Sequence, residues 1–168
     1  MTTKKSDTEH KVDASTNNEV VSEAGKSNFD PTNKEHVKRW GQEQFTQAVK
    51  YCSKHFLPID HLQNSKSSIL PPVLAIWNIK LQTKPATEIW VIGGLVSMDH
   101  VSTDVAPTAR EALRHFSLSW QMKAATLEKN LESTANNRDQ AQQKKVIQTL
   151  IQEAEELYDL FADDNLWK

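Results

Sequence analysis

Two short apolar segments joined by a six-residue polar turn constrain the fold of this chain more than any other feature. In residues 73–81 every odd-numbered residue is apolar, whereas the even-numbered residues change from apolar to polar along the segment. This alternation predicts a β-strand that is buried on both faces at its start and on one face at its end. Residues 88–95 carry a run of β-prone Ile, Trp and Val side chains before Gly93-Gly94, which predicts the returning strand of an antiparallel hairpin.

Helices must cover this hairpin, because two strands alone are marginally stable in water. Three segments have apolar residues at spacings of three and four, and we expect amphipathic helices over 34–56, 109–127 and 141–162. The second helix has two plausible starts: an Asp104 cap followed by Pro107, or a capping box formed by Thr108 and Glu111. Residues 57–71 and 130–142 are expected to connect these elements, and 59–62 or 95–101 could add a short third strand. The sequence thus predicts an α+β domain in which about three helices pack on a short antiparallel sheet.

The first 33 residues differ in composition from the rest of the chain. Their few apolar residues are scattered without period, so this segment cannot bury enough area to offset an ordering cost of about 1–2 kcal/mol per residue. We therefore expect a disordered polar tail over 1–33 and a single domain over 34–168. The tail holds four basic and six acidic side chains, whereas the domain has sixteen of each. A neutral domain gives no general electrostatic reason to bind DNA, RNA or an anionic membrane.

The sequence also contains features that bear on cellular compartment. It has no early apolar run that could serve as a signal-peptide core, and no run of about 18 or more apolar residues that could span a bilayer. Cys52 is the single cysteine, so no internal disulfide can form. These features favour a reducing, cytoplasmic setting. Because Cys52 lies on the apolar face of its expected helix, we interpret it as a core residue and not as a thiol activated by His55.

The tryptophans are interpreted as core residues. Trp40, Trp77, Trp90 and Trp120 each fall at a position of a helix or strand that is consistent with burial, and one buried Trp removes up to about 250 Å² from water. Gly93-Gly94 matches no phosphate-binding loop pattern. We therefore expect a turn at the end of the strand that needs positive φ.

Polar side chains suggest two weak candidate sites. Asp99 and His100 are candidates for catalysis, together with His115, which could approach them in three dimensions, although capping and backbone hydrogen bonds are the commoner use of such residues. Arg110 and Arg114 stand one helical turn apart with Ser117 and Gln121 on the same polar face, which could hold a carboxylate or phosphate. Surface ion pairing is the commoner alternative. The spacings match no metal site, and no cofactor is indicated.

The end of the chain combines acidic and aromatic residues. Tyr158, Phe161, Leu166 and Trp167 lie among acids, as in segments that dock into a partner's groove. The same residues can fold back onto their own core, and we favour this alternative. Residues 34–54 carry five basic and two acidic side chains, so we also expect that helix to lie against the acidic last helix.

Several segments together resemble a known family. They are Leu74-Ala75-Ile76-Trp77, Trp90-Val91-Ile92-Gly93-Gly94, Asp99-His100, the run from Ala109 to Gln121 (AREALRHFSLSWQ), and the ending from Leu157-Tyr158 to Trp167. Over roughly residues 35–167 the chain is similar to a family of small uncharacterised bacterial proteins described as a domain of unknown function. The resemblance implies a bacterial cytoplasmic protein and supplies no activity, cofactor or catalytic residue.

Two functions remain open from the sequence. The neutral domain, the missing catalytic pattern and the acidic-aromatic ending favour a non-enzymatic protein-interaction module. The alternative is an enzyme that binds an anion or small molecule around Asp99, His100, Arg110 and Arg114. The sequence identifies neither a partner nor an oligomeric state.

Overall fold

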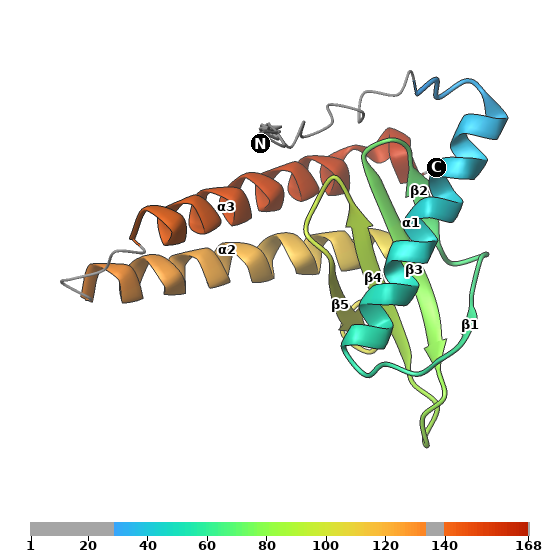
Figure 1. Cartoon of the computed structure of the whole chain (residues 1–168), viewed down its shortest axis with the longest axis horizontal. Coiled ribbons are helices and arrows are strands. Elements are labelled where there is room, and N and C mark those ends of the chain that lie inside the picture. The colour runs from blue at the N-terminus through green and yellow to red at the C-terminus, as the bar shows by residue number, and fades with distance from the viewer. Residues whose placement is uncertain (1–28, 134–139, 168) are drawn as a thin grey trace, which may run out of the picture.

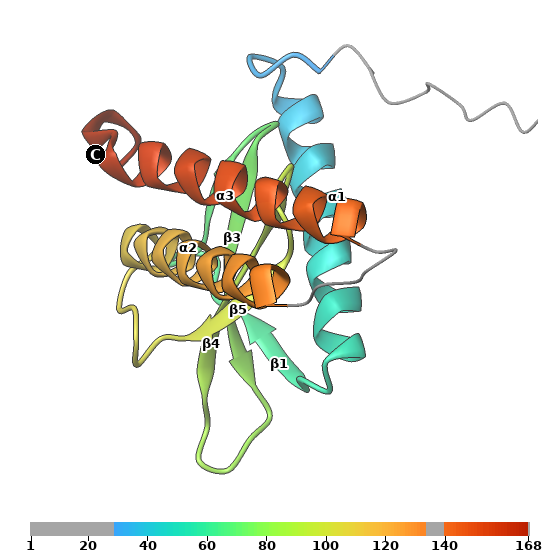
Figure 2. The same ribbon diagram turned by 90° about the vertical axis from the view of Figure 1, so that its left-hand side faces the viewer.

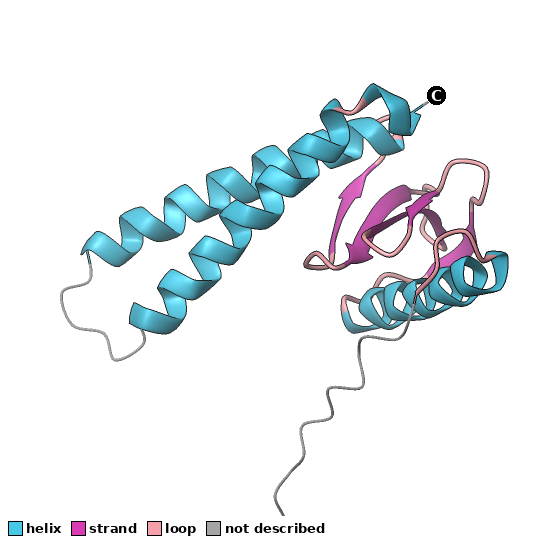
Figure 3. Cartoon of the chain, turned by 90° about the horizontal axis from the view of Figure 1, so that it is seen from above, coloured by secondary structure: helices cyan, strands magenta, loops and turns pink. Residues whose placement is uncertain are grey.

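The computed structural model describes residues 29–133 and 140–167, which form three layers (Figure 1). A five-stranded sheet lies between a single helix on one face and a pair of antiparallel helices on the other (Figure 3). Residues 1–28 of the predicted tail, and 134–139 of the predicted connection, lie outside the described residues. The elements in chain order are α1 (Lys34–Lys54), β1 (Ile59–Leu62), β2 (Ser68–Leu70), β3 (Leu74–Leu81), β4 (Glu88–Gly94), β5 (Asp99–Ser102), α2 (Ala109–Ser133), α3 (Gln140–Ala162) and a 3₁₀ turn (Asp164–Trp167). The α+β class expected from the sequence is confirmed.

The predicted hairpin forms the centre of the sheet. β3 and β4 pair antiparallel with Trp77 opposite Val91, and their turn projects at the bottom of Figure 2. The strand order is β1-β3-β4-β5, and β2 pairs with β3 as well. The segment 59–62 is therefore a strand, and of the segment 95–101 only the part from Asp99 onward is a strand, as β5. β2 lies in a stretch expected to be a loop. Gly94 has φ of 124°, and a Cβ there would lie 2.4 Å from the Val73 carbonyl oxygen. The expected positive-φ turn is confirmed at this residue.

Alternation along the central strands divides the core into two clusters. One face of the sheet carries Ala75, Trp77 and Ile79, which pack with Ala48 and Cys52 of α1. The opposite face carries Leu74, Ile76, Trp90 and Ile92, which pack under α2 and α3. We call the first group the α1 cluster and the second the α2–α3 cluster. Helices thus cover both faces, so β3 is buried on both sides from Leu74 to Ile79, and Lys80 near its end is half-buried. This corrects the expectation that its even positions become exposed, because Asn78 is fully buried.

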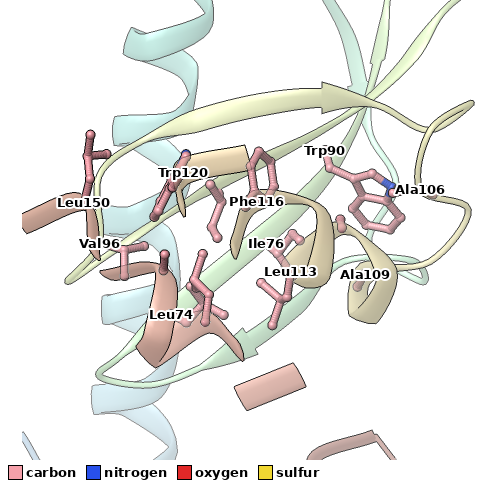
Figure 4. Packing of buried hydrophobic residues seen from close by; sticks show 14 of the residues in the cluster. Leu74, Ile76, Trp90, Val96, Ala106, Ala109, Leu113, Phe116, Trp120 and Leu150 are labelled. Carbon is pink, nitrogen blue, oxygen red and sulfur yellow. Dashed lines mark hydrogen bonds between the residues drawn. The ribbon is translucent and has the colours of Figure 1, made fainter. Parts of the chain in front are cut away.

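Tryptophans lie in both clusters. In the α2–α3 cluster the Trp90 indole lies beside the start of α2 and donates a hydrogen bond of 2.6 Å to the Ala106 carbonyl (Figure 4). Trp120 from α2 is 2 % exposed in the same cluster, and Trp77 is buried beneath α1. Trp40 is half-buried against the α1 cluster. The interpretation of these four residues as core is confirmed, with Trp40 at its margin.

Local signals fix the ends of α1. Asn33 accepts hydrogen bonds from the backbone N–H groups of Glu35 and His36, which caps the first turn. At the other end the Leu57 N–H donates to the Cys52 carbonyl, and Phe56 between them has φ of 57°, as in a Schellman motif. The expectation that α1 lies against α3 is wrong, because the sheet stands between them (Figure 3). Burying the apolar face of each helix on the sheet outweighs attraction between exposed charges.

The α2–α3 hairpin is longer than the sheet that it covers. Thr108 and Glu111 exchange backbone and side-chain hydrogen bonds, so the capping box is the start of α2. α2 continues to Ser133 and α3 begins at Gln140, which makes the helical part longer than expected on both sides of the connection. The ends of both helices extend together past the edge of the sheet (Figure 1). None of the helices within the described ranges has the length and apolar character needed to cross a bilayer.

Candidate functional site

A hollow of about 390 Å³ lies where the β4–β5 turn meets α2 and α3. We call this hollow the notch. It is lined by Ser97, Met98, Asp99, Trp120, Lys123, Gln142, Lys145, Val146, Thr149 and Leu150. The lining combines an apolar wall with one carboxylate and two ammonium groups, so the notch is the most chemically varied concave surface that we find among the described residues.

Asp99 is the acidic group of the notch. It pairs with Ile92, a member of the α2–α3 cluster, so its side chain lies on that face of the sheet. The Trp120 indole N–H donates to Oδ2 at 2.9 Å, and the backbone N–H of His100 donates to Oδ1 at 2.8 Å. No lysine, arginine or histidine in the described ranges forms an ion pair with this half-buried carboxylate. Asp99 is thus held in place by two neutral donors and retains acceptor capacity.

A second carboxylate lies beside the notch. Glu153 of α3 accepts a hydrogen bond of 3.1 Å at Oε1 from the backbone N–H of Ser97. Its other oxygen, Oε2, is buried and has no hydrogen-bond partner among the described residues. The turn from Ser97 to Asp99 therefore connects two carboxylates without a neutralising cation.

Two lysines contribute the opposite charge. Lys123 comes from α2 and Lys145 from α3, and both line the notch. Both residues are exposed, and neither forms an ion pair with an acid of the described chain. Their ammonium groups are available to an anionic group.

His100 does not join Asp99 in the notch. Neighbouring residues of a strand point to opposite faces, and the His100 ring lies on the α1 side, where its Nδ1 is 2.9 Å from the Tyr51 hydroxyl. The His55 ring packs on Tyr51 at a centroid distance of 4.2 Å. Burial, together with the nearby charges of Asp99 and Cys52, raises the pKa of Tyr51 to about 12. Burial also raises the pKa of the Cys52 thiol, which fits its role in the core.

Arg110 and Arg114 belong to α2, and their side chains lie beside the C-terminal end of α3 and not in the notch with Asp99. Arg110 donates to the Phe161 carbonyl at 2.9 Å and to Asp164 at 2.6 Å. Both guanidinium groups lie over the Phe161 ring, at 5.2 and 6.0 Å. The arginines thus anchor the end of the chain, which leaves Arg110 little capacity for a ligand anion.

The C-terminal segment folds back, as favoured from the sequence. Trp167 donates its indole N–H to the Leu160 carbonyl at 2.9 Å and packs against the α2–α3 cluster. Phe161 is half-buried under the arginines, whereas Leu166 is 37 % and Tyr158 48 % exposed. Of the four side chains considered for partner binding, Tyr158 is the most available.

The remaining candidates lie elsewhere on α2. His115 and Arg114 line a hollow of about 210 Å³ with Val105, Glu111 and Leu118, and Gln121 is exposed on the helix. The expectation that Ser117 shares this polar face is wrong, because its side chain is fully buried and donates to the Ala154 carbonyl at 2.7 Å. The residues proposed for an enzyme site therefore occupy three separate places. No three His, Cys, Asp or Glu side chains of the described chain are grouped to hold a metal ion.

Sequence reasoning did not identify Lys123, Lys145 and Glu153 as site residues. Each flanks the apolar stripe of its helix, which is where amphipathic helices usually carry charge. Trp120 was assigned to the core, which is correct, but its indole N–H also holds Asp99. Lys123 follows Trp120 by three residues, so this spacing indicates that the lysine lies on the same side of α2 as the Trp120 indole.

Comparisons with known proteins give one result. A family model described as a domain of unknown function, DUF4826, matches residues 34–167. Neither curated proteins nor solved structures provide a match. The matched range covers the three layers from the first residue of α1 to Trp167, so the chain belongs to this DUF4826 family of domains of unknown function.

Proposed function

We propose that this domain is a non-enzymatic protein-interaction module and that it self-associates through α3. The observation that supports this is a match between an exposed knob and a hollow on one flank of the helix. Tyr158 is 48 % exposed, and a hollow of about 590 Å³ is lined by Glu128, Leu131, Lys144, Ile147 and Gln148 near the other end of α3.

One stripe of α3 connects the knob and the hollow. Its side chains are spaced alternately by four and three residues, so they share a face, and all are exposed or half-buried. We call it the outer stripe, formed by Lys144, Gln148, Ile151, Glu155 and Tyr158. The outer stripe shares no residue with the flank of α3 that lines the notch.

A twofold axis can satisfy both contacts at once. The hollow centres near Ile147 and lies about 16 Å along the helix from Tyr158, at 1.5 Å per residue. When two copies of α3 lie antiparallel, an axis beside residue 152 brings each Tyr158 to the hollow of the other copy. Such an interface is isologous and closes with two molecules.

Charge along α3 favours this direction. Lys144 and Lys145 lie near its start, whereas Glu153, Glu155, Glu156 and Asp159 lie in its second half. An antiparallel pair places the basic end of each helix beside the acidic end of the other, and a parallel pair places like charges together. Complementary charges of this kind fix the orientation of an interface more than its affinity.

The enzyme alternative lacks a comparable observation. It requires Asp99, His100, Arg110 and Arg114 to converge, whereas His100 contacts Tyr51 and Arg110 contacts the C-terminal segment. A cytoplasmic, bacterial setting is likewise our proposal. It is supported by the single, buried Cys52 and by the family resemblance.

Sedimentation velocity over a concentration series tests self-association. We expect a monomer–dimer equilibrium with a Kd of about 10–100 μM, since two helical flanks form a small interface. Tyr158→Ala should weaken it at least about tenfold, because it removes two buried aromatic contacts per dimer. The matched control is Met122→Ala, which changes a side chain that is 72 % exposed on α2 and should leave the Kd unchanged.

Charge reversal adds a test of direction. Lys144→Glu alone and Asp159→Lys alone should each weaken the dimer, because an axis beside residue 152 brings Asp159 of one copy next to Lys144 of the other, and each change sets like charges against each other twice per dimer. The double variant Lys144→Glu/Asp159→Lys should recover the wild-type Kd. A wild-type protein that stays monomeric at millimolar concentration would falsify the proposal, and so would equal effects of Tyr158→Ala and Met122→Ala.

A further inference from the structure

We propose that the notch binds a small zwitterion, a molecule of the amino-acid class with an ammonium group and an anionic group on a short apolar body. The ammonium lies at Asp99, and the anionic group lies between Lys123 and Lys145. This site goes beyond self-association, and it lies on a different flank of α3 from the outer stripe.

The acidic end of the notch is suited to an ammonium group. Asp99 has two oxygens with about four acceptor positions, and the donors from Trp120 and His100 use two of them. The buried, unpartnered Oε2 of Glu153 adds negative charge next to Ser97, which lines the notch. A charge that is removed from water needs a partner, and a ligand ammonium with three N–H donors would supply that partner to Asp99 when the ligand fills the notch.

The basic end is suited to an anion. Lys123 and Lys145 reach the notch from two facing helices. An anionic group between them would form charge-assisted hydrogen bonds to both ammonium groups, which are stronger than neutral ones. A ligand with an anion alone would bring uncompensated negative charge towards Asp99. A ligand with a cation alone would bring uncompensated positive charge towards the two lysines. A zwitterion satisfies both ends.

The walls and the size of the notch limit the body of the ligand. Met98, Trp120, Val146 and Leu150 provide apolar surface between the charged ends. The volume of about 390 Å³ lies at the lower end of the ~300–1,000 Å³ that is typical of small-molecule pockets. The ligand is therefore a small molecule with a short aliphatic body.

Three ligands with the same six-carbon body separate the contributions of the two charges. They are 6-aminohexanoate, which carries both charges, hexylamine, which carries the ammonium only, and hexanoate, which carries the carboxylate only. Titration by calorimetry, together with the NMR signal of the Trp120 indole N–H, measures binding at the notch. We expect 6-aminohexanoate to bind at least about tenfold more tightly than either single-charge ligand. Glycine and 4-aminobutyrate then define the best separation of the charges.

Matched variants assign the ends. Asp99→Asn keeps an acceptor for Trp120 but removes the charge, so it should weaken binding of the zwitterion at least about tenfold and should not weaken binding of hexanoate. Lys123→Met/Lys145→Met should weaken binding of the zwitterion and should not weaken binding of hexylamine, because the variant also removes the repulsion between the lysines and the hexylamine ammonium. Lys129→Met, on α2 outside the notch, is the control and should bind as wild type.

Several outcomes would overturn the proposal. One is that the Trp120 indole signal does not shift with any zwitterion of the series at about 10 mM. Another is that hexylamine binds as tightly as 6-aminohexanoate. A third is that Lys129→Met weakens zwitterion binding as much as Lys123→Met/Lys145→Met does. Sedimentation velocity of Asp99→Asn keeps this test separate from self-association, because Asp99 lies on β5 and not on α3, so this variant should retain the dimer.

Discussion

The fully buried amide of Asn78 makes a sharp prediction about stability. Its backbone is satisfied, because its N–H donates to Ser67 Oγ at 2.9 Å and its carbonyl accepts from the Gln63 N–H at 2.8 Å. Its side chain is 0 % exposed, and neither Oδ1 nor Nδ2 has a hydrogen-bond partner among the described residues. Each unsatisfied buried polar group costs about 1–3 kcal/mol.

We therefore expect Asn78→Leu to stabilise the protein. The substitution replaces two unpaired polar atoms with methyl groups of similar arrangement, next to the Trp90 side chain across the strand pair. Removing the two unsatisfied polar atoms should stabilise the fold by about 1–3 kcal/mol for each atom. Crowding by the larger methyl groups costs about 1–3 kcal/mol, so the free energy of unfolding should rise by about 1–3 kcal/mol. Urea unfolding followed by circular dichroism measures this difference as a shift of the midpoint at constant slope.

Asn78→Asp is the matched comparison. It places a carboxylate in the same position without a cation, so we expect a loss of several kcal/mol. Asn78→Leu destabilising the fold by more than about 1 kcal/mol would refute the reasoning, because it would mean that the amide makes interactions worth more than its burial costs.

Three further predictions concern the backbone and one phenol. Gly94→Ala should destabilise the fold by at least about 2 kcal/mol in urea unfolding, because φ is 124° and the new Cβ would lie 2.4 Å from a backbone oxygen; a neutral effect would contradict that geometry. Gly41→Ala in α1 should stabilise it by about 0.5–1 kcal/mol, since the nearest atom to the new Cβ is Ile69 Cδ1 at 3.5 Å; a loss of stability would show that the helix contact is tighter. In the variant Tyr158→Phe, Tyr51 is the remaining tyrosine, so a pH titration followed by tyrosinate absorbance reports on Tyr51 alone. Its midpoint should lie near the raised pKa of about 12, and a midpoint near 10 would contradict the burial of the Tyr51 phenol. Since the folded-state pKa lies above the unfolded value, the contribution of Tyr51 to stability is present below pH 10 and is lost as pH rises towards 12.

The elements that were predictable from sequence are those with a strong local signal. Residues 73–81 alternate, and residues 88–95 carry a run of β-prone side chains before a Gly pair, so both strands were predictable. The three helices repeat their apolar residues every three or four positions, so their existence followed from periodicity. The choice between two starts of α2 did not follow, because Asp104 and Thr108 are both acceptable caps. The structure shows the capping box of Thr108 with Glu111, and Asp104 instead accepts from the Ser102 hydroxyl at 3.2 Å.

The short edge strands depend on partners and not on their own sequence. β2 is Ser68–Leu70 and is half-buried throughout, so its three residues carry no alternation that a pattern could detect. It exists because the edge of β3 offers unpaired N–H and carbonyl groups, with Ser68 opposite Ile76. Asn78 shows the same limit, since a polar residue near the end of a strand gives no sign that it will be fully buried.

The candidate site was only partly predictable for a geometric reason. Asp99 and His100 were grouped because they are neighbours, yet β5 sends their side chains to opposite faces of the sheet. An assignment of 99–102 as a strand would have separated them. The notch gathers one turn and two helices, and Lys145 lies 46 residues after Asp99 in the sequence. No local pattern connects positions that only the packing of α3 on the sheet brings together.

The antiparallel pairing of α3 can be tested by distances between two spin labels in the dimer. In a Cys52→Ala background, a label at Gln152 should lie close to its twofold mate, whereas labels at Ala141 should be about 35 Å apart, from 22 residues at 1.5 Å each and a helix separation of about 10 Å. Pulsed electron double resonance measures both pairs. A short distance at Gln152 with a long one at Ala141 is the predicted result. Short distances at both positions, or no dipolar signal from either at concentrations above the Kd, would contradict self-association through the outer stripe.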